Sequence, residues 1–140
     1  MAHIPAELKA IKAKKILVVD DSISARGSMV DTLKNAGFIT SIAVDGLDAL
    51  AVLESDTFDA MILDLEMPRM NGLELAMHLR SLKDYQEIPL VMVTSRSTAK
   101  HKDLASKAGV NSYFTKPYQE NELLNKLHEL IQNQNQDLHF

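Results

Sequence analysis

The chain has 140 residues, 46% of them hydrophobic and 24% charged, which is typical of a single globular domain. It contains no cysteine, which excludes disulfide bonds and thiolate metal sites. The net charge of −4 argues against nucleic acid or an anionic membrane as a direct partner, and no apolar run is long enough to cross a bilayer.

The two ends of the chain differ in composition from its middle. Residues 1–14 are rich in Ala and Lys and are expected to form a tail or linker. Residues 133–140 are rich in Gln and Asn and are expected to form a disordered C-terminal tail. Because the N-terminus lacks a signal-peptide pattern, we expect a cytoplasmic domain that comprises residues 15–132.

In the first half of this domain, short apolar runs alternate with amphipathic stretches. Lys15–Asp20 is a continuous apolar run that ends in a carboxylate, as is typical of a strand covered on both faces. Ser22–Ala36 is expected to be a helix that stops at Gly37, followed by a strand at Phe38–Val44 and a helix at Gly46–Ser55. The apolar positions expected on the buried faces of these two helices are Ile23, Val30, Leu33, Ala49, Leu50 and Leu53.

The second half repeats this alternation. Continuous apolar runs predict buried strands at Phe58–Asp64 and Ile88–Thr94, with an amphipathic helix at Gly72–Leu82 between them. A Lys-rich, weakly apolar helix at Thr98–Ala108 and a short strand at Ser112–Thr115 follow. The last helix, Gln119–Asn133, has the clearest apolar stripe, formed by Leu123, Leu124, Leu127, Leu130 and Ile131.

Fivefold alternation of strand and helix predicts an α/β fold. Strands joined by right-handed helical crossovers form an open parallel sheet with helices on both faces. Ligands bind such sheets beyond the carboxyl ends of the strands, near the point where the strand order reverses. We therefore expect the functional residues of this chain at that edge.

Polar residues follow four of the predicted strands. The residues at the carboxyl ends of these strands are Asp20-Asp21, Asp64, Thr94 and Lys116. Any one of them could be an ordinary turn or capping residue, but together they indicate a site. Converging carboxylates need a cation, and without His or Cys in the motifs the oxygen ligands favour Mg²⁺ or Mn²⁺.

The same residues suit phosphoryl chemistry. A carboxylate can attack phosphorus and form an acyl phosphate. The incoming phosphoryl group is negatively charged, so a fixed cation and a hydrogen-bond donor are needed beside the metal. Lys116 is the candidate cation and the Thr94 hydroxyl the candidate donor.

These segments carry a family resemblance. The motifs VVDDS (18–22), LDLEMPRMNG (63–72), VTS (93–95) and YFTKPY (113–118) resemble those of response-regulator receiver domains, typified by the chemotaxis regulator CheY. The similarity extends over about residues 15–132. It implies a CheY-like, flavodoxin-like doubly wound fold with five parallel strands in the order 2-1-3-4-5 and five helices.

The resemblance also implies roles for individual residues. Asp64 would be phosphorylated by a histidine kinase or a histidine phosphotransfer domain, in a transfer that the receiver itself catalyses. Mg²⁺ or Mn²⁺ would be held by Asp20, Asp21, Asp64 and the main-chain carbonyl of Glu66. Thr94 and Lys116 would bind phosphoryl oxygens, and the Lys116–Pro117 bond would be cis.

The resemblance further implies a conformational switch. Tyr113 would turn inward as Thr94 moves toward the phosphoryl group, although a half-buried tyrosine is also a common packing residue. The face built from the fourth helix, fifth strand and fifth helix would then bind a downstream protein, with the domain a monomer or weak dimer. The weakly apolar helix Thr98–Ala108 suits the moving part.

Finer details of the motifs are similar to receivers attached to CheA-type hybrid histidine kinases, including those of chemotaxis and of type IV pilus twitching motility. This similarity implies an excised C-terminal domain preceded by a linker. It leaves open whether the receiver signals an output or drains phosphoryl groups from its kinase.

Two other functions remain open. One is a Mg²⁺-dependent phosphohydrolase with an aspartyl-phosphate intermediate, although such enzymes place the nucleophile on the first strand, whereas here the best candidate is on the third. The other is a receiver-like binding module that is never phosphorylated, although such modules usually lack one of the key residues. Glu66 and Arg96 flank the site, and we expect them to tune the phosphoryl lifetime; Glu66 could pair with Arg69, with Arg96 or with neither.

Overall fold

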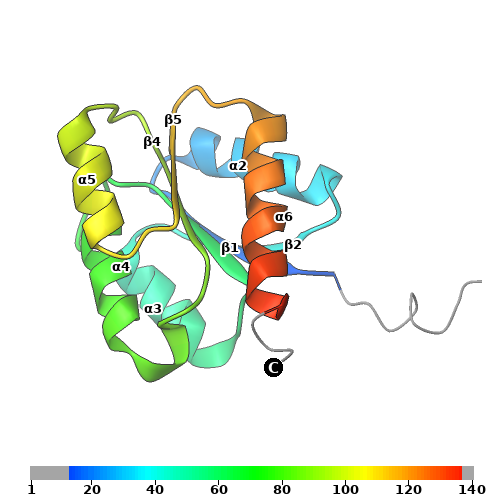
Figure 1. The fold of residues 1–140 in the computed structure, drawn as a ribbon, viewed down its shortest axis with the longest axis horizontal. Coiled ribbons are helices and arrows are strands. Elements are labelled where there is room, and N and C mark those ends of the chain that lie inside the picture. Colours follow the sequence, from blue (N-terminus) through cyan, green and yellow to red (C-terminus); the bar gives the residue numbers. More distant parts are fainter. Residues whose placement is uncertain (1–12, 137–140) are drawn as a thin grey trace, which may run out of the picture.

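The computed structural model describes residues 13–136 and contains one parallel sheet with the order β2-β1-β3-β4-β5 (Figure 1). The strands are β1 (Lys15–Val19), β2 (Ile39–Ala43), β3 (Ala60–Leu63), β4 (Leu90–Thr94) and β5 (Ser112–Thr115). The α-helices are α2 (Ile23–Asn35), α3 (Gly46–Ser55), α4 (Gly72–Ser81), α5 (Ala99–Lys107) and α6 (Glu120–Gln136). The predicted strand order and the five predicted helices are confirmed within these residues.

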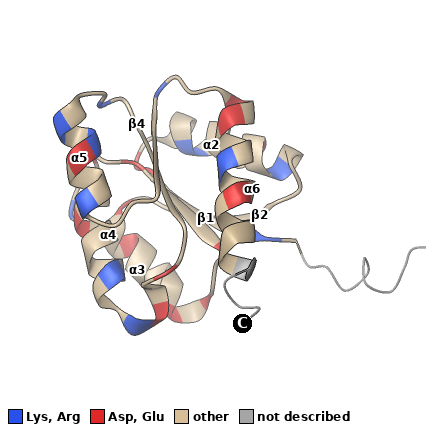
Figure 2. Cartoon of the chain, in the orientation of Figure 1, with Lys and Arg blue, Asp and Glu red and all other residues tan. Residues whose placement is uncertain are grey.

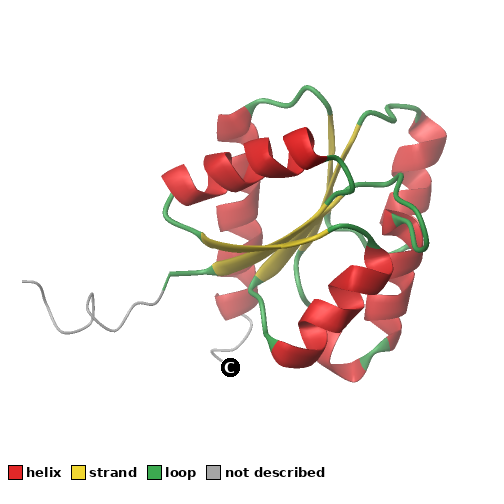
Figure 3. Cartoon of the chain, turned by 180° about the vertical axis from the view of Figure 1, so that it is seen from behind, coloured by secondary structure: helices red, strands yellow, loops and turns green. Residues whose placement is uncertain are grey.

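The sheet lies between two layers of helices, which Figure 3 shows from behind. Alternate residues of β1 enter different cores, because successive side chains of a strand point to opposite faces. Ile16 and Val18 pack with residues of α2 and α6, whereas Leu17 and Val19 pack with residues of α3 and α4. All residues of β3 and β4 are buried, as expected for continuous apolar runs covered on both sides.

Short polar residues begin several helices, and they fix the loops at the carboxyl edge of the sheet. Ser22, Asp45, Asn71 and Thr98 each accept a hydrogen bond from a backbone N–H of the first turn that follows. Such caps satisfy donors that otherwise lack a partner inside the helix. In these four cases the cap fixes the loop where it enters the helix.

The buried face of α2 differs from the prediction. Ile23 is 80% exposed, and the helix buries Met29, Thr32 and Leu33 instead. At 3.6 residues per turn, Ile23 lies roughly 120° around the helix from Met29, which turns it away from the sheet. Its prediction as a core residue is wrong.

The remaining differences concern short segments. A 3-10 turn, η1 (Lys83–Tyr85), precedes β4 and was not predicted. Helix α6 continues to Gln136, so the described part of the predicted C-terminal tail is helical rather than disordered. Residues 1–12 and 137–140 lie outside the described residues, and the predictions for them stay predictions. Among residues 13–136, no helix combines the length and apolar character needed to cross a membrane.

Candidate functional site

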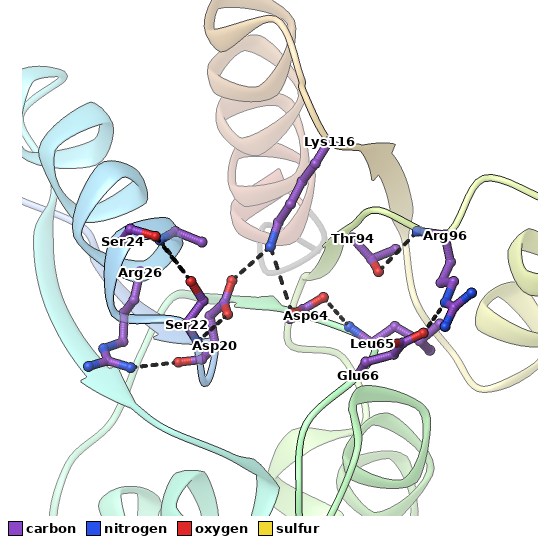
Figure 4. A network of polar contacts seen from close by, with 11 residues as sticks. Asp20, Ser22, Ser24, Arg26, Asp64, Leu65, Glu66, Thr94, Arg96 and Lys116 are labelled. Atoms are coloured by element: carbon purple, nitrogen blue, oxygen red, sulfur yellow. Dashed lines mark hydrogen bonds and ion pairs between the residues drawn. The ribbon is translucent and has the colours of Figure 1, made fainter.

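Four of the predicted site residues lie together at the carboxyl edge of the sheet, namely Asp20, Asp64, Thr94 and Lys116 (Figure 4). Parallel register places Val19 of β1 beside Leu63 of β3, so Asp20 and Asp64 follow neighbouring strand ends. The Asp64 N–H donates to the Val19 carbonyl at 2.9 Å. On the other side, the Lys116 N–H donates to the Thr94 carbonyl at 2.8 Å, which extends the pairing of β5 with β4.

Three carboxylates form an acidic cluster. Ligand oxygens of Asp20, Asp21 and Asp64 lie within 4.8 Å of one another. Asp20 is buried and Asp21 is exposed, so the cluster is open to solvent on one side. A set of hard oxygen donors with room for water fits Mg²⁺ or Mn²⁺ better than Zn²⁺.

Lys116 supplies the positive charge inside this cluster. Its Nζ lies 3.0 Å from Asp20 Oδ2 and 3.7 Å from Asp64 Oδ2. The other oxygen of Asp20 accepts a hydrogen bond from the Ser22 N–H at 2.9 Å. The Lys116–Pro117 peptide bond is cis, as the family resemblance implied.

The local electrostatics favour a bound cation at Asp64. Burial raises the pKa of the Asp64 carboxyl above its usual range, and the neighbouring charge of Asp20 raises it further. Lys116, the Leu65 N–H and the Thr94 hydroxyl act in the opposite direction and do not offset these two effects. One ammonium group among three carboxylates leaves net negative charge, which a divalent cation would neutralise.

Thr94 and Tyr113 are joined through the loop that follows β4. The buried Thr94 hydroxyl accepts a hydrogen bond from the Arg96 N–H at 3.3 Å. The Tyr113 hydroxyl donates to the Arg96 carbonyl at 2.6 Å, and its ring packs on a buried cluster that includes Met92 and Ala105. Both side chains thus contact one residue of the same loop, and the inward turn of Tyr113 stays a prediction.

The side chain of Glu66 points away from the acidic cluster. It forms an ion pair with Arg96, and both side chains are more than half exposed. This contact decides between the partners that the sequence left open, and it bridges the loops after β3 and β4 beside Asp64 (Figure 4). Within Glu66, the candidate metal ligand is therefore the main-chain carbonyl and not the side chain.

Sequence reasoning missed several residues that support the site. Arg26 Nη1 donates to the Asp20 carbonyl at 2.8 Å and so holds the end of β1 from helix α2. Arg69 has a positive φ of 65° and forms two hydrogen bonds with the buried Asp45. Asp45 stands before an apolar helical stretch and could have been recognised as a helix cap. The pairing of Asp45 with Arg69 has no sequence signal.

The chain is similar to known signalling proteins. It is 37% identical over 117 residues to the response regulator MprA of Mycobacterium ulcerans (strain Agy99), a match that covers 84% of this chain and 50% of that protein. The chain thus spans about half the length of the curated relatives it matches. Among solved structures, the chemotaxis protein CheY4 of Vibrio cholerae is 34% identical, with a TM-score of 0.79 over 85% of this chain and 99% of that one.

A more distant structure shares the fold. The receiver domain of the sensor histidine kinase PA1611 from Pseudomonas aeruginosa PAO1 is 23% identical, with a TM-score of 0.79 over 86% of this chain and 98% of that one. That protein holds a magnesium ion in its active-site cleft. The family model of the response regulator receiver domain matches residues 16–128, which is most of the chain. This protein therefore belongs to the response-regulator receiver domain family.

Proposed function

We propose that Asp64 accepts a phosphoryl group from the phosphohistidine of a histidine kinase or histidine phosphotransfer domain. The observation that carries this proposal is the meeting of three carboxylates, one ammonium group and one buried hydroxyl at the carboxyl edge of the sheet. Asp20, Asp21, Asp64 and the Glu66 carbonyl would hold Mg²⁺ or Mn²⁺. The bound cation would offset the negative charge that gathers as the phosphoryl group approaches Asp64.

In the transfer, an Asp64 carboxylate oxygen attacks phosphorus and forms an acyl O–P bond. The bond between phosphorus and the donor's imidazole nitrogen breaks, and its electron pair returns to that nitrogen. Lys116, already within 3.7 Å of Asp64, is placed to pair with a phosphoryl oxygen. The Thr94 hydroxyl oxygen accepts from the Arg96 N–H, and its own hydrogen would be donated to a second phosphoryl oxygen.

Movement of Thr94 would change the surface formed by α5, β5 and α6. Of the residues in α5 only Ala105 is buried, so this helix is weakly held. Lys100, Lys102 and Lys107 are exposed on this helix together with Asp103, and Figure 2 shows the basic and acidic positions of α5. We propose that a downstream protein binds this surface in the cytoplasm, with the receiver a monomer or weak dimer.

The wider setting of the receiver is also a proposal. The motif details favour attachment to a CheA-type hybrid histidine kinase in chemotaxis or twitching motility, whereas the curated relative MprA is a response regulator of which the match covers 50%. A time course of phosphotransfer from candidate histidine donors would separate an output role from a phosphate sink.

Phosphorylation is tested by mass spectrometry after incubation with acetyl phosphate and Mg²⁺. We expect the wild-type protein to gain one phosphoryl group and Asp64→Asn to gain none. Asp59→Asn is the matched control, because Asp59 lies near the opposite end of β1, where its carboxylate accepts a hydrogen bond from the Lys15 N–H, and this variant should gain the same mass. No gain in the wild type would support the unphosphorylated binding module, and multiple turnover of a phosphomonoester would support the phosphohydrolase.

The Glu66–Arg96 ion pair is expected to set the phosphoryl lifetime. It lies across the loops beside Asp64, where it would hinder the water that hydrolyses the acyl phosphate. We expect Glu66→Asn and Arg96→Ala each to change the autodephosphorylation rate by roughly threefold, measured as loss of the phosphorylated mass, a small effect because exposed ion pairs contribute little. Unchanged rates in both variants would remove the pair from the mechanism.

A further inference from the structure

The loop between β3 and α4, residues 65–71, carries the Glu66 carbonyl and is fastened at its base. The Gly72 N–H donates to the Leu65 carbonyl at 2.9 Å. A Cβ on Gly72 would lie only 2.1 Å from the Asp64 carbonyl oxygen, so the start of α4 is packed directly against the phosphoacceptor's backbone. The base of the loop is therefore held by close backbone contacts.

The tip of the same loop is fastened by different contacts. Arg69 adopts a φ of 65°, a left-handed conformation that residues other than glycine rarely adopt. Its guanidinium donates to Asp45 from Nε at 2.7 Å and from Nη2 at 3.0 Å. Beside it, the Gly46 N–H donates to the Met70 carbonyl at 2.9 Å. The unfavourable backbone conformation of Arg69 is thus stabilised by a bidentate ion pair and a backbone hydrogen bond.

The partner of this tip is the turn between β2 and α3. The Asp45 carboxylate is buried and also caps α3 by accepting from the Asp48 N–H at 2.9 Å. The strand that leads into this turn also contacts the acidic cluster, because the Asp20 N–H donates to the carbonyl of Ala43, the last residue of β2, at 3.1 Å. The end of β2 therefore holds Asp20, and the turn that follows it holds the loop that carries Glu66.

We infer that the Arg69–Asp45 pair positions the Glu66 carbonyl relative to Asp20 and Asp21, and so sets the affinity for the divalent cation. This inference rests on the proposed function, in which that carbonyl is a ligand. Arg69 and Asp45 are positioning residues, since neither belongs to the acidic cluster. Groups that orient metal ligands in this way often change metal affinity by a factor of ten or more when removed.

The test is the Mg²⁺ dissociation constant of the unphosphorylated protein, measured by isothermal titration calorimetry. Arg69→Asn removes the guanidinium but keeps a residue that tolerates positive φ. Asp45→Asn removes the charge but keeps a good helix cap. We expect each to raise the Kd roughly tenfold, the double variant to raise it no further, and Arg69→Lys to recover part of the loss.

Asp56→Asn is the matched control. Asp56 lies at the opposite end of α3 and pairs with Lys15, so it joins the same helix to β1 far from the acidic cluster. This variant should keep the wild-type Kd even where its Tm falls. If Asp45→Asn and Arg69→Asn lower Tm without changing the Kd, the pair is merely structural and the inference is overturned. A wild type that binds no Mg²⁺ would instead contradict the proposed function, and the inference with it.

Discussion

Gly72→Ala is expected to destabilise the domain by about 3 kcal/mol and to lower its Tm by roughly 10 °C. Alanine is the better helix former, so helix propensity alone predicts the opposite sign at this first position of α4. The steric clash outweighs helix propensity and makes the change destabilising, because the added Cβ would lie 2.1 Å from the Asp64 carbonyl oxygen and 3.0 Å from Met92 Cε. Backbone atoms on one side of this contact cannot rotate away, so Asp64 must move and phosphorylation should slow.

Gly27→Ala is the matched control for this change. Gly27 lies within α2, and a Cβ added there meets nothing within 4 Å. Helix propensity then acts alone, and the variant should be more stable by about 0.5–1 kcal/mol with unchanged phosphorylation. Thermal unfolding of the wild type, Gly72→Ala and Gly27→Ala measures the two changes in stability, and intact-protein mass spectrometry measures phosphorylation. A Gly72→Ala protein as stable as the wild type would show that Asp64 and α4 are not packed as described.

Lys116→Met is expected to slow phosphorylation by acetyl phosphate by about 10²-fold, the usual effect of removing one fixed donor from a charged transition state. Methionine keeps the apolar stem but leaves the Asp20 and Asp64 carboxylates without the ammonium that lies 3.0 and 3.7 Å from them. The acidic cluster becomes more negative, so the Mg²⁺ Kd should fall rather than rise. Opposite changes in rate and metal affinity distinguish this role from general damage to the site.

Lys15→Met is the matched control for Lys116→Met. Lys15 pairs with Asp56 near the opposite end of β1, so its loss should leave both the phosphorylation rate and the Mg²⁺ affinity unchanged. The two quantities are measured by intact-protein mass spectrometry over time and by calorimetry. A phosphorylation rate for Lys116→Met within about twofold of the wild type would remove Lys116 from the transfer step.

Much of the fold was predictable because its signals are local. Continuous apolar runs identified the strands β1, β3 and β4, and the apolar stripe of α6 matched its buried residues. The error at Ile23 has a physical reason, since a helix with few large apolar residues leaves the direction of its buried face poorly determined. The end of α6 was misjudged because Gln and Asn do not oppose helix formation strongly enough to stop it.

The residues of the candidate site were also predictable, because parallel strands bring their carboxyl ends to one edge. Asp20, Asp64, Thr94 and Lys116 each follow or end a strand, so topology alone brings them together. The supporting contacts were not predictable. Arg69 and Asp45 are 24 positions apart in the sequence, and their pairing depends on the positive φ of Arg69, which only the folded loop reveals.

Asp64 is expected to carry a phosphoryl group only when the acidic cluster holds a divalent cation. Borohydride reduction of the acetyl-phosphate-treated protein, followed by peptide mass spectrometry, locates the acyl phosphate directly. We expect modification at Asp64 with Mg²⁺ and none after chelation with EDTA. Modification at another carboxylate, or equal modification of Asp64 in EDTA, would contradict this expectation.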